Sequence, residues 1–433
     1  MAPAESPGRM QPKASGAVGG LLGRSAVFFF ASGVSRGLPF LLLPFLTRYL
    51  SPADFGRLSM ATAVASVLAI LIGLNPHLFV TVKYAKAPRD ELARYVCQAL
   101  VLCGWSFAAV CLFVLFVPHA LGRYGIAVPV AFVLAGVGLS RAVEMMSLTI
   151  LQMEKRAIAF LGYSILAATT TATLTIGLVG FSPIGWAGSV VAECVGVGMT
   201  AALVTRSVAR RGYVCGGFDR SRTIEMVRFS LPLVPHTLAF WALSAAGRFF
   251  IAEHFSDTEV GMFGVAHSLG LGLSLVHESC QRAWQPDFMK ALADGGRNRL
   301  RMVVAATWGY YLAAVIIGWA YAEATAHLLP IIVGPAYEDA VPLVLPICLA
   351  HTFLGMYRLV AGYLYFNSRT GTLALITVLS AALCVVLNMV LVPREGAQGA
   401  AIAMAVAFGA CFLAVKLASM MAHRMPWFSF WKP

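Results

Sequence analysis

The sequence predicts an all-α, polytopic membrane protein with about twelve transmembrane helices. Of its 433 residues, 59% are hydrophobic and only 12% are charged, and the mean hydropathy is +0.79. Soluble domains carry roughly twice that charged fraction. Twelve apolar runs recur along the chain, each long enough to cross ~30 Å of hydrocarbon as a helix. A repeat between the two halves predicts two six-helix lobes related by a pseudo-two-fold axis along the membrane normal.

The apolar runs set the expected order of the spans. They lie at 25–48, 56–75, 95–117, 126–150, 157–180, 183–205, 229–251, 259–281, 302–323, 340–364, 371–392 and 397–419. Several end at prolines, which interrupt helices, as at Pro76, Pro118 and Pro183. We expect a tail over 1–24, an N-terminal lobe over 25–206, a basic linker over 207–224, a C-terminal lobe over 225–420 and a second tail over 421–433.

The distribution of lysine and arginine predicts the orientation. Of the 32 basic residues, 24 fall in the segments on one side of the predicted membrane, 4 fall on the other side and 4 lie within spans. Because short loops rich in these residues stay in the cytoplasm, both termini are expected to be cytoplasmic. The net charge of +13 then reflects topology and contact with anionic headgroups, and no nucleic-acid partner is expected.

Three short matches carry the repeat. The motif SPADFG at Ser51–Gly56 matches SDTEVG at Ser256–Gly261, and Gly185–Gly188 matches Gly396–Gly399. A polar, basic turn also follows the fourth and the tenth span, at 152–156 and 367–369. Because each half has an even number of spans, the halves share one orientation, an arrangement that in transporters places the substrate at their interface.

Charges within the spans are the candidate functional residues. A cation at bilayer depth costs at least ~2.5 kcal/mol, so it normally faces the protein interior or a water-filled cavity. The candidate substrate-binding cations are Arg36, Arg141, Arg248 and Arg358, of which Arg36 lies nearest the middle of its span. The candidate ion-coupling carboxylates are Glu144, Glu193 and Glu278.

Structural roles compete with these functional ones. Arg141 and Glu144 lie three residues apart on one helix face, so an internal ion pair is the alternative to a role in a cavity. Arg358 has a position similar to that of Arg141 in the other half, so the two are expected to face each other, unless Arg358 snorkels to the interface. Snorkelling is also an alternative for Arg248. Glu193 is expected as a lone carboxylate, either a proton carrier or a protonated structural group.

Other chemistry is sparse in the sequence. Nine cysteines, mostly in apolar runs and without a CxxC pair, are expected to be packing residues rather than disulfides or metal ligands. His236, His267 and His277 fit packed neutral side chains better than a proton relay. The motifs GxxxxGK[ST], HExxH and GxSxG are missing. No cofactor, metal or enzymatic activity is expected, and a membrane polysaccharide polymerase or ligase is the least favoured alternative.

The segment LPFLTRYLSPADFG at 43–56 resembles the end of the first helix in polysaccharide flippases of the Wzx type, in the multidrug/oligosaccharidyl-lipid/polysaccharide (MOP) exporter superfamily. Similar segments follow at 229–236, 363–370 and 388–401. The resemblance implies two six-helix lobes around a cavity that opens alternately to each side of the bacterial inner membrane. It also implies a polyprenyl-diphosphate-linked oligosaccharide as substrate, flipped outward for surface polysaccharide, O-antigen or exopolysaccharide.

The same resemblance implies roles for the charges and partners. Arginines in the cavity would hold the diphosphate bidentately. Coupling to H⁺ or Na⁺ and association with the glycan polymerase machinery are further expectations. A multidrug or cation extruder of the same superfamily is the main alternative function, and it would favour buried carboxylates and aromatic side chains over arginines.

Overall fold

The computed structural model describes residues 33, 37, 38, 40–84, 87–422, 425 and 427. The N-terminal half of this described chain contains α2 (Pro52–Gly73), α3 (Pro76–Tyr84), α4 (Arg89–Phe116), α5 (Pro118–Gly122), α6 (Val128–Met153), α7 (Ala157–Phe181) and α8 (Trp186–Arg210). The C-terminal half contains α9 (Arg220–Ser230), η1 (Leu231–Leu233), α10 (Val234–His254), α11 (Asp257–Asp294), α12 (Arg297–Val333), η2 (Pro335–Ala340), α13 (Val341–Phe366) and α14 (Thr370–Ala422).

The predicted all-α, polytopic architecture is confirmed. Ten helical segments in the described part of the chain are long and apolar enough to cross a membrane. One of them, α14, contains the last two expected spans, because its backbone leaves the helical conformation at Gly396. The first expected span, 25–48, is represented by the helix Phe40–Tyr49, and most of its remainder lies outside the described residues.

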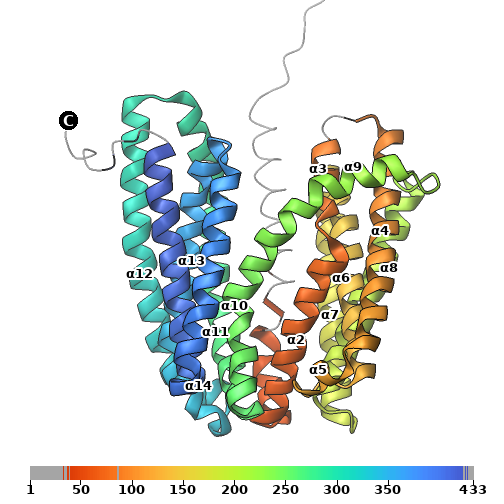
Figure 1. Ribbon diagram of the computed structural model, residues 1–433. Helices are drawn as coiled ribbons and strands as arrows, with labels where there is room; N and C mark the ends of the chain where they lie inside the picture. Colours follow the sequence, from red (N-terminus) through yellow and green to blue (C-terminus); the bar gives the residue numbers. More distant parts are fainter. Residues whose placement is uncertain are drawn as a thin grey trace, which may run out of the picture.

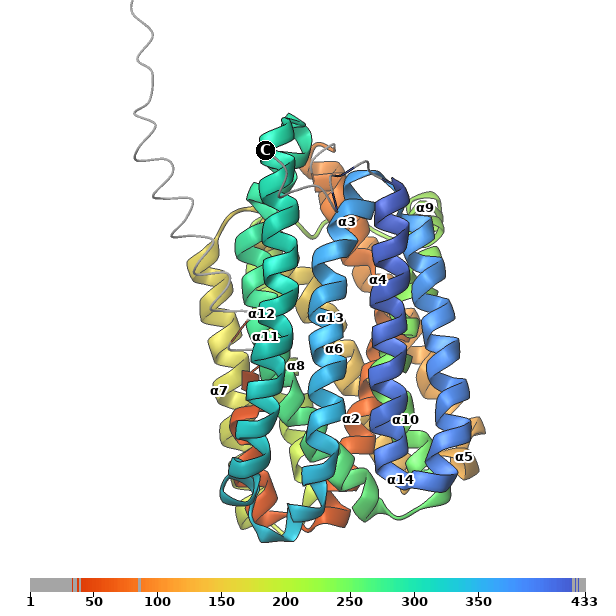
Figure 2. The ribbon, with the colours of Figure 1, turned by 90° about the vertical axis from the view of Figure 1, so that its left-hand side faces the viewer.

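The helices form two bundles that meet at one end and separate toward the other (Figure 1). In the N-terminal bundle α6 packs against α2, α4 and α8, and α8 packs against α7. In the C-terminal bundle α13 packs against α11, α12 and α14, and α14 packs against α10. The long helices run roughly side by side in both views (Figure 2). The largest contacts between the bundles are those of α2 with α11 and α10.

The predicted repeat is visible in the backbone. Gly185 has φ 60° and ψ −135°, and its counterpart Gly396 has φ 58° and ψ −136°. Only glycine adopts this conformation readily, which explains why both halves place glycine there. The polar turns match as well, because Lys155 and Ser368 have φ values of 58° and 56°. The two lobes therefore turn their chain in the same way at equivalent points.

The repeated Ser–Gly motifs meet each other where the bundles touch, and we call this region the closed end. A Cβ atom on Gly56 would lie 1.8 Å from the carbonyl oxygen of Asp257, and one on Gly261 would lie 2.0 Å from that of Pro52. Only glycine lets the two helix starts approach so closely. The Nε of Arg57 donates a hydrogen bond of 2.9 Å to Asp257 across the same contact. The opposite end, where α3 and α9 lie, is the open end (Figure 1).

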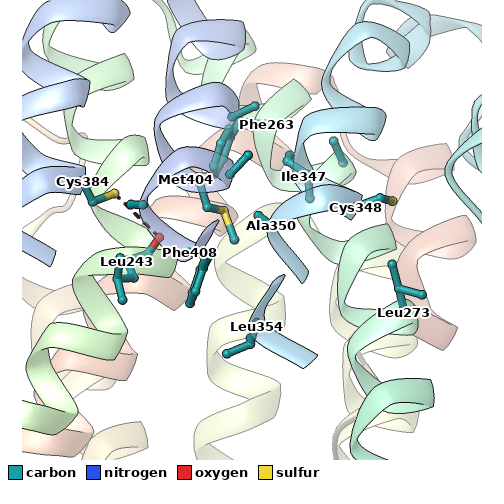
Figure 3. Packing of buried hydrophobic residues seen from close by; sticks show 14 of the residues in the cluster. Leu243, Phe263, Leu273, Ile347, Cys348, Ala350, Leu354, Cys384, Met404 and Phe408 are labelled. Carbon is teal, nitrogen blue, oxygen red and sulfur yellow. Dashed lines mark hydrogen bonds between the residues drawn. The ribbon is translucent and has the colours of Figure 1, made fainter. Parts of the chain in front are cut away.

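A continuous apolar core holds the C-terminal lobe together. Leu243 of α10, Leu354 of α13 and Met404 and Phe408 of α14 belong to one buried cluster (Figure 3). The thiol of Cys384 lies 3.9 Å from the carbonyl oxygen of Leu243, where it donates a weak hydrogen bond (Figure 3). All nine cysteines are free, as the sequence predicted. Buried polar side chains, among them Arg248, His277 and His351, interrupt this apolar packing.

The connection between the lobes is bound to α4 by the side chain of Gln98. Its amide nitrogen donates to the carbonyl of Gly217 at 2.8 Å, and its oxygen accepts from the Asp219 backbone N–H and the Thr223 hydroxyl, each at 3.1 Å. Asp219 caps α9, and the backbone N–H of Arg222 lowers the pKa of its carboxyl group. This part of the expected linker is therefore held against the N-terminal lobe.

Leucine in place of Gly56 is expected to prevent formation of the closed end, because the new side chain would overlap the backbone of Asp257. The overpacking costs ~1–3 kcal/mol, which should lower the ratio of closed to open molecules by about fivefold or more. The measurement is cross-linking by a short bis-maleimide between cysteines that replace Arg57 and Asp257, in a chain without its native cysteines. Gly177→Leu is the control, because no atom lies within 4 Å of a Cβ there. Equal cross-linking of Gly56→Leu and the parent chain would contradict the prediction.

Candidate functional site

A cavity of about 1330 Å³ lies between the two lobes. The N-terminal lobe contributes residues of α2, α3, α6, α7 and α8 to its wall, and the C-terminal lobe contributes residues of α10 and α11. Phe55 and Ser59 lie in the wall near the closed end, whereas His77 and Arg282 belong to its opposite part. The cavity is therefore the space that the diverging bundles leave between them.

Much of the cavity wall carries hydroxyl groups. Those of the N-terminal lobe are Ser59, Thr62, Ser66, Thr149, Ser164, Thr171, Thr175 and Ser189, and those of the C-terminal lobe are Thr237, Ser244 and Ser268. Several also bond to carbonyl groups of their own helix, as Ser66 does to Thr62 at 2.7 Å. These short polar side chains can offer hydrogen bonds to a ligand without placing a net charge in the wall.

An ion pair between Arg141 of α6 and Glu193 of α8 lies in the wall of the N-terminal lobe. The Nε of Arg141 donates to a Glu193 carboxylate oxygen at 2.8 Å, and its Nη2 contacts the same oxygen. Its Nη1 donates to the Ser66 hydroxyl on α2 at 3.3 Å. The side chains are 33% and 21% exposed, so the pair meets the cavity but is partly shielded from solvent. It joins three helices of one lobe.

This pairing corrects two expectations from the sequence. Arg141 binds Glu193 and not Glu144, and Glu193 is consequently not a lone carboxylate. The helix spacing put Arg141 and Glu144 on one face, but α8 packs against α6 and brings a second carboxylate closer. Glu144 also lines the cavity, and no ion pair of its side chain is found in the described part of the chain. Only the packing of α8 decides which carboxylate neutralises the arginine.

Arg248 of α10 lies deep in the cavity and not at a membrane interface. Its side chain is only 7% exposed, so the alternative of snorkelling is wrong. The Nε donates to the hydroxyl of Ser59 on α2 at 2.8 Å, and Nη1 donates to the carbonyl of Ser244 at 3.2 Å. The guanidinium also lies 5.4 Å from the centre of the Phe263 ring. Within the described residues these partners include no carboxylate, so its positive charge is not neutralised by them.

Arg358 does not face Arg141 across the cavity as expected, because α13 contributes no residue to the described wall. Its Nη1 lies 3.7 Å from one oxygen of Glu278, whose other oxygen lies 2.5 Å from Nη2 of Arg282. Arg282, four residues after Glu278 on α11, lines the cavity instead. Arg282 was not among the residues predicted from the sequence, although its spacing from Glu278 is that of a helical ion pair.

Further polar contacts across the lobes were also missed. Trp241 of α10 donates from its indole nitrogen to the carbonyl of Ala63 at 3.0 Å, and Asn75 donates to the Thr237 hydroxyl at 3.1 Å. Both lie in or beside apolar runs, where one sequence gives no signal of their partners. The remaining candidate, Arg36, lies outside the described residues. The described site thus consists of Arg141 with Glu193, Arg248 and Arg282, with Glu144 nearby.

A family model described as polysaccharide biosynthesis protein matches residues 22–291, which is more than half of the chain. The chain belongs to this family. The matched part contains the whole described N-terminal lobe, the connection between the lobes, α10 and most of α11. All the charged residues that line the described cavity are therefore within the part that the family model covers.

Individual relatives agree with this family. A protein of the Lsg locus of Haemophilus influenzae is 22% identical over 279 residues, which make up 62% of this chain and 66% of that protein. The lipid II flippase MurJ in an inward closed conformation is 13% identical, with a TM-score of 0.71 over 92% of this chain and 91% of that one. An inward-facing MATE transporter of the MOP superfamily is 14% identical, with a TM-score of 0.67 over 89% and 94%.

These likenesses confirm the fold of the MOP superfamily that the sequence resemblance implied. An outward-facing MATE transporter gives a lower TM-score of 0.55, over 92% of this chain and 95% of that one. The solved structures that share this fold are described as transporters and a flippase. This likeness in fold favours a transporter over the polymerase or ligase considered from the sequence.

The ion pair in the cavity wall should show measurable coupling. In a double-mutant cycle with Arg141→Met and Glu193→Gln, we expect the pair to contribute about 1 kcal/mol to the free energy of unfolding, less than a fully buried pair because both side chains are partly exposed. Denaturant unfolding of the purified protein in micelles measures it. Arg123→Met with Glu253→Gln is the control, because these side chains are 76% and 50% exposed, and coupling there should stay below about 0.5 kcal/mol. Equal coupling energies in both cycles would contradict a stabilising ion pair between Arg141 and Glu193.

Proposed function

We propose that this member of the family flips a polyprenyl-diphosphate-linked oligosaccharide from the cytoplasmic to the outer face of the bacterial inner membrane, for the synthesis of surface or exopolysaccharide. The observation that carries the proposal is the large cavity between the lobes, whose wall combines hydroxyl groups with arginines from both lobes. The family description and the neighbour described as a lipid II flippase support a lipid-linked substrate.

The arginines suit a diphosphate. A guanidinium can donate two parallel hydrogen bonds to phosphate oxygens, and such charge-assisted bonds are about twice as strong as neutral ones. Arg248 is the best placed, because its described partners are a hydroxyl, a carbonyl and an aromatic ring, none of which cancels its charge. Arg282 and Arg141 add positive charge that is shared with carboxylates. The diphosphate is therefore proposed to bind closest to Arg248.

The rest of the cavity suits a glycan. Its volume of about 1330 Å³ exceeds the ≈ 300–1,000 Å³ of sites for small molecules. Sugars present many hydroxyl groups, and the serine and threonine side chains of the wall can donate to or accept from them. Only two carboxylates, Glu144 and Glu193, lie in the described wall, so the cavity has little to attract a cationic cargo.

The proposed cycle follows from the two ends of the molecule. Basic side chains such as Lys83, Arg89 and Arg211 lie beside the open end, which by the positive-inside rule would face the cytoplasm, as would both termini. The lipid-linked substrate would then enter from the cytoplasmic side. Separation of Gly56 from Gly261 at the closed end would release it outward, while the open end closes. An ion gradient of H⁺ or Na⁺ would supply the energy.

Methionine in place of Arg248 is expected to reduce flipping by about tenfold or more, because a charge-assisted hydrogen bond of ~1.5–3 kcal/mol to phosphate is lost. The measurement is lipid-linked oligosaccharide exposed on the outer face, in cells in which this chain is the sole flippase, at equal amounts of protein in the membrane. Arg123→Met is the control, because that side chain is 76% exposed and does not line the described cavity. Normal surface glycan from a chain carrying both Arg248→Met and Arg141→Met would refute the proposal.

A multidrug or cation extruder is the second candidate, and the observation in its favour is Glu144, a carboxylate in the cavity wall without an ion pair in the described chain. If this were the function, Glu144→Gln would abolish efflux of ethidium and leave surface glycan unchanged. Under the flippase proposal, we expect expression of the chain to change ethidium efflux by less than about twofold. Fluorescence of cells loaded with the dye measures this.

A further inference from the structure

Two helices of the C-terminal lobe, α11 and α13, hold each other by a reciprocal histidine–glycine contact. A Cβ atom on Gly270 of α11 would lie 2.5 Å from the ring of His351 on α13, and one on Gly355 of α13 would lie 2.5 Å from the ring of His277 on α11. Both imidazoles are only 2% exposed. Each ring thus occupies space that a glycine of the facing helix leaves, and two titratable groups are placed inside the interface.

Each of these rings has one nitrogen bonded and one nitrogen without a partner. Nδ1 of His351 shares a hydrogen bond of 2.6 Å with the Ser274 hydroxyl, and Nδ1 of His277 shares one of 3.0 Å with the Tyr310 hydroxyl. Nε2 of both rings is buried and has no hydrogen-bond partner in the described chain. When Nδ1 donates its hydrogen, Nε2 has a lone pair that can accept a proton.

The pair is connected to the cavity by a third imidazole. His267 of α11 is 8% exposed and lies in the cavity wall, and its ring centre is 5.3 Å from that of His351. On the other side of His351, Ser274 is one helical turn before His277 on α11. The three imidazoles therefore extend from the cavity into the interface between α11 and α13.

Two arginines lie near the three histidines. Arg358 lies close enough to act electrostatically on His277 and His351, and Arg248 does so on His267. Tyr310 on α12 bonds to His277, and Tyr321 on the same helix donates to the carbonyl of Leu269, two residues after His267. The other titratable and charged groups close to the rings are Glu278 on α11, Cys348 and Arg358 on α13, and Arg248 on α10. Glu278, the one carboxylate among them, is shared with Arg282.

We propose that His351 and His277 form a proton-binding site that couples proton entry to the movement of the lobes. This rests on the proposed function, which it deepens by naming the ion as H⁺ and its site. A proton would bind when the lobes open outward and water reaches the interface between α11 and α13. Return to the packed conformation, with the rings against glycine and near Arg358, would expel it toward the cytoplasm. One proton would then enter the cell for each substrate molecule that leaves it. In this proposal the histidines carry the proton in place of Glu193, which is bound to Arg141.

The first experiment needs no substrate. Cysteines replacing Arg57 and Asp257 report the closed end by cross-linking in nanodiscs, and acidification from about pH 8 to about pH 5.5 should lower the cross-linked fraction at least about twofold, because protonation disfavours the packed interface. His351→Asn and His277→Asn each keep a polar atom at the place of Nδ1 but cannot be protonated, and each should abolish this pH dependence. His327→Asn is the control, because that side chain is 77% exposed; it should behave like the parent chain.

Two outcomes would overturn the proton site. One is an unchanged pH dependence in both asparagine variants, and the other is a parent chain whose cross-linking does not respond to pH. If either variant folds poorly, Gly270→Ala provides a second test that leaves both histidines in place. Its methyl group would displace His351 from the packed position and should shift the midpoint of the pH response by about one unit or more. No shift in that variant would also overturn the proposal.

The second experiment separates this inference from the proposed function. Proteoliposomes of the full chain are given a polyprenyl diphosphate bearing N-acetylglucosamine, with and without a pH gradient. The gradient should raise flipping by about tenfold in the parent chain and leave His351→Asn at the rate without a gradient. If the parent chain flips the substrate equally well without a gradient, the proton-binding site is refuted and the proposed flippase function stands. The opposite outcome has two parts: the chain flips no substrate, but its closed end responds to pH and His351→Asn abolishes that response. It would refute the proposed flippase function and support the proton-binding site.

Discussion

The structure depends on one backbone contact, the crossing of α2 and α11 at the closed end. Gly56 and Gly261 lie at equivalent points of the repeat, and each faces a backbone carbonyl of the other lobe at a distance that excludes any side chain. The lobes are consequently joined near one end and diverge from it, which produces the cavity. Arg57 with Asp257, and Trp241 with Ala63, add polar bonds across the same region, all of which an outward-opening movement would have to break or rearrange.

The charges within the membrane are arranged by this geometry. Arg141 and Glu193 neutralise each other within the N-terminal lobe, and Glu278 is shared by Arg282 and Arg358 within the C-terminal lobe. Arg248 differs, because its described bonds are to uncharged groups and one of them, to Ser59, crosses to the other lobe. A cation that is buried at the junction and keeps its charge is both costly and well placed to bind an anionic headgroup.

The two lobes use one backbone plan for different chemistry. Matching turns at Gly185 and Gly396 show that the chain paths are equivalent, yet the hydroxyl-rich wall belongs mainly to the N-terminal lobe. The buried histidines His267, His277 and His351 belong to the C-terminal lobe. Such a division would allow substrate and coupling ion to bind at separate places and to act on each other through the relative position of the lobes, as linkage between two sites requires.

The sequence by itself determined the all-α membrane fold, the repeat and the family resemblance. This was possible because a span must be apolar for its whole length and must satisfy its own backbone hydrogen bonds. Each helix can therefore be recognised from its own segment of the sequence. The partners of the charges were not determined. Helix spacing related Arg141 to Glu144, whereas the packing of α8 on α6 supplied Glu193, and His351 acquired its role only through Gly270 on another helix. Which side chains meet depends on how helices are rotated and packed, and that is decided by tertiary contacts between residues far apart in the chain.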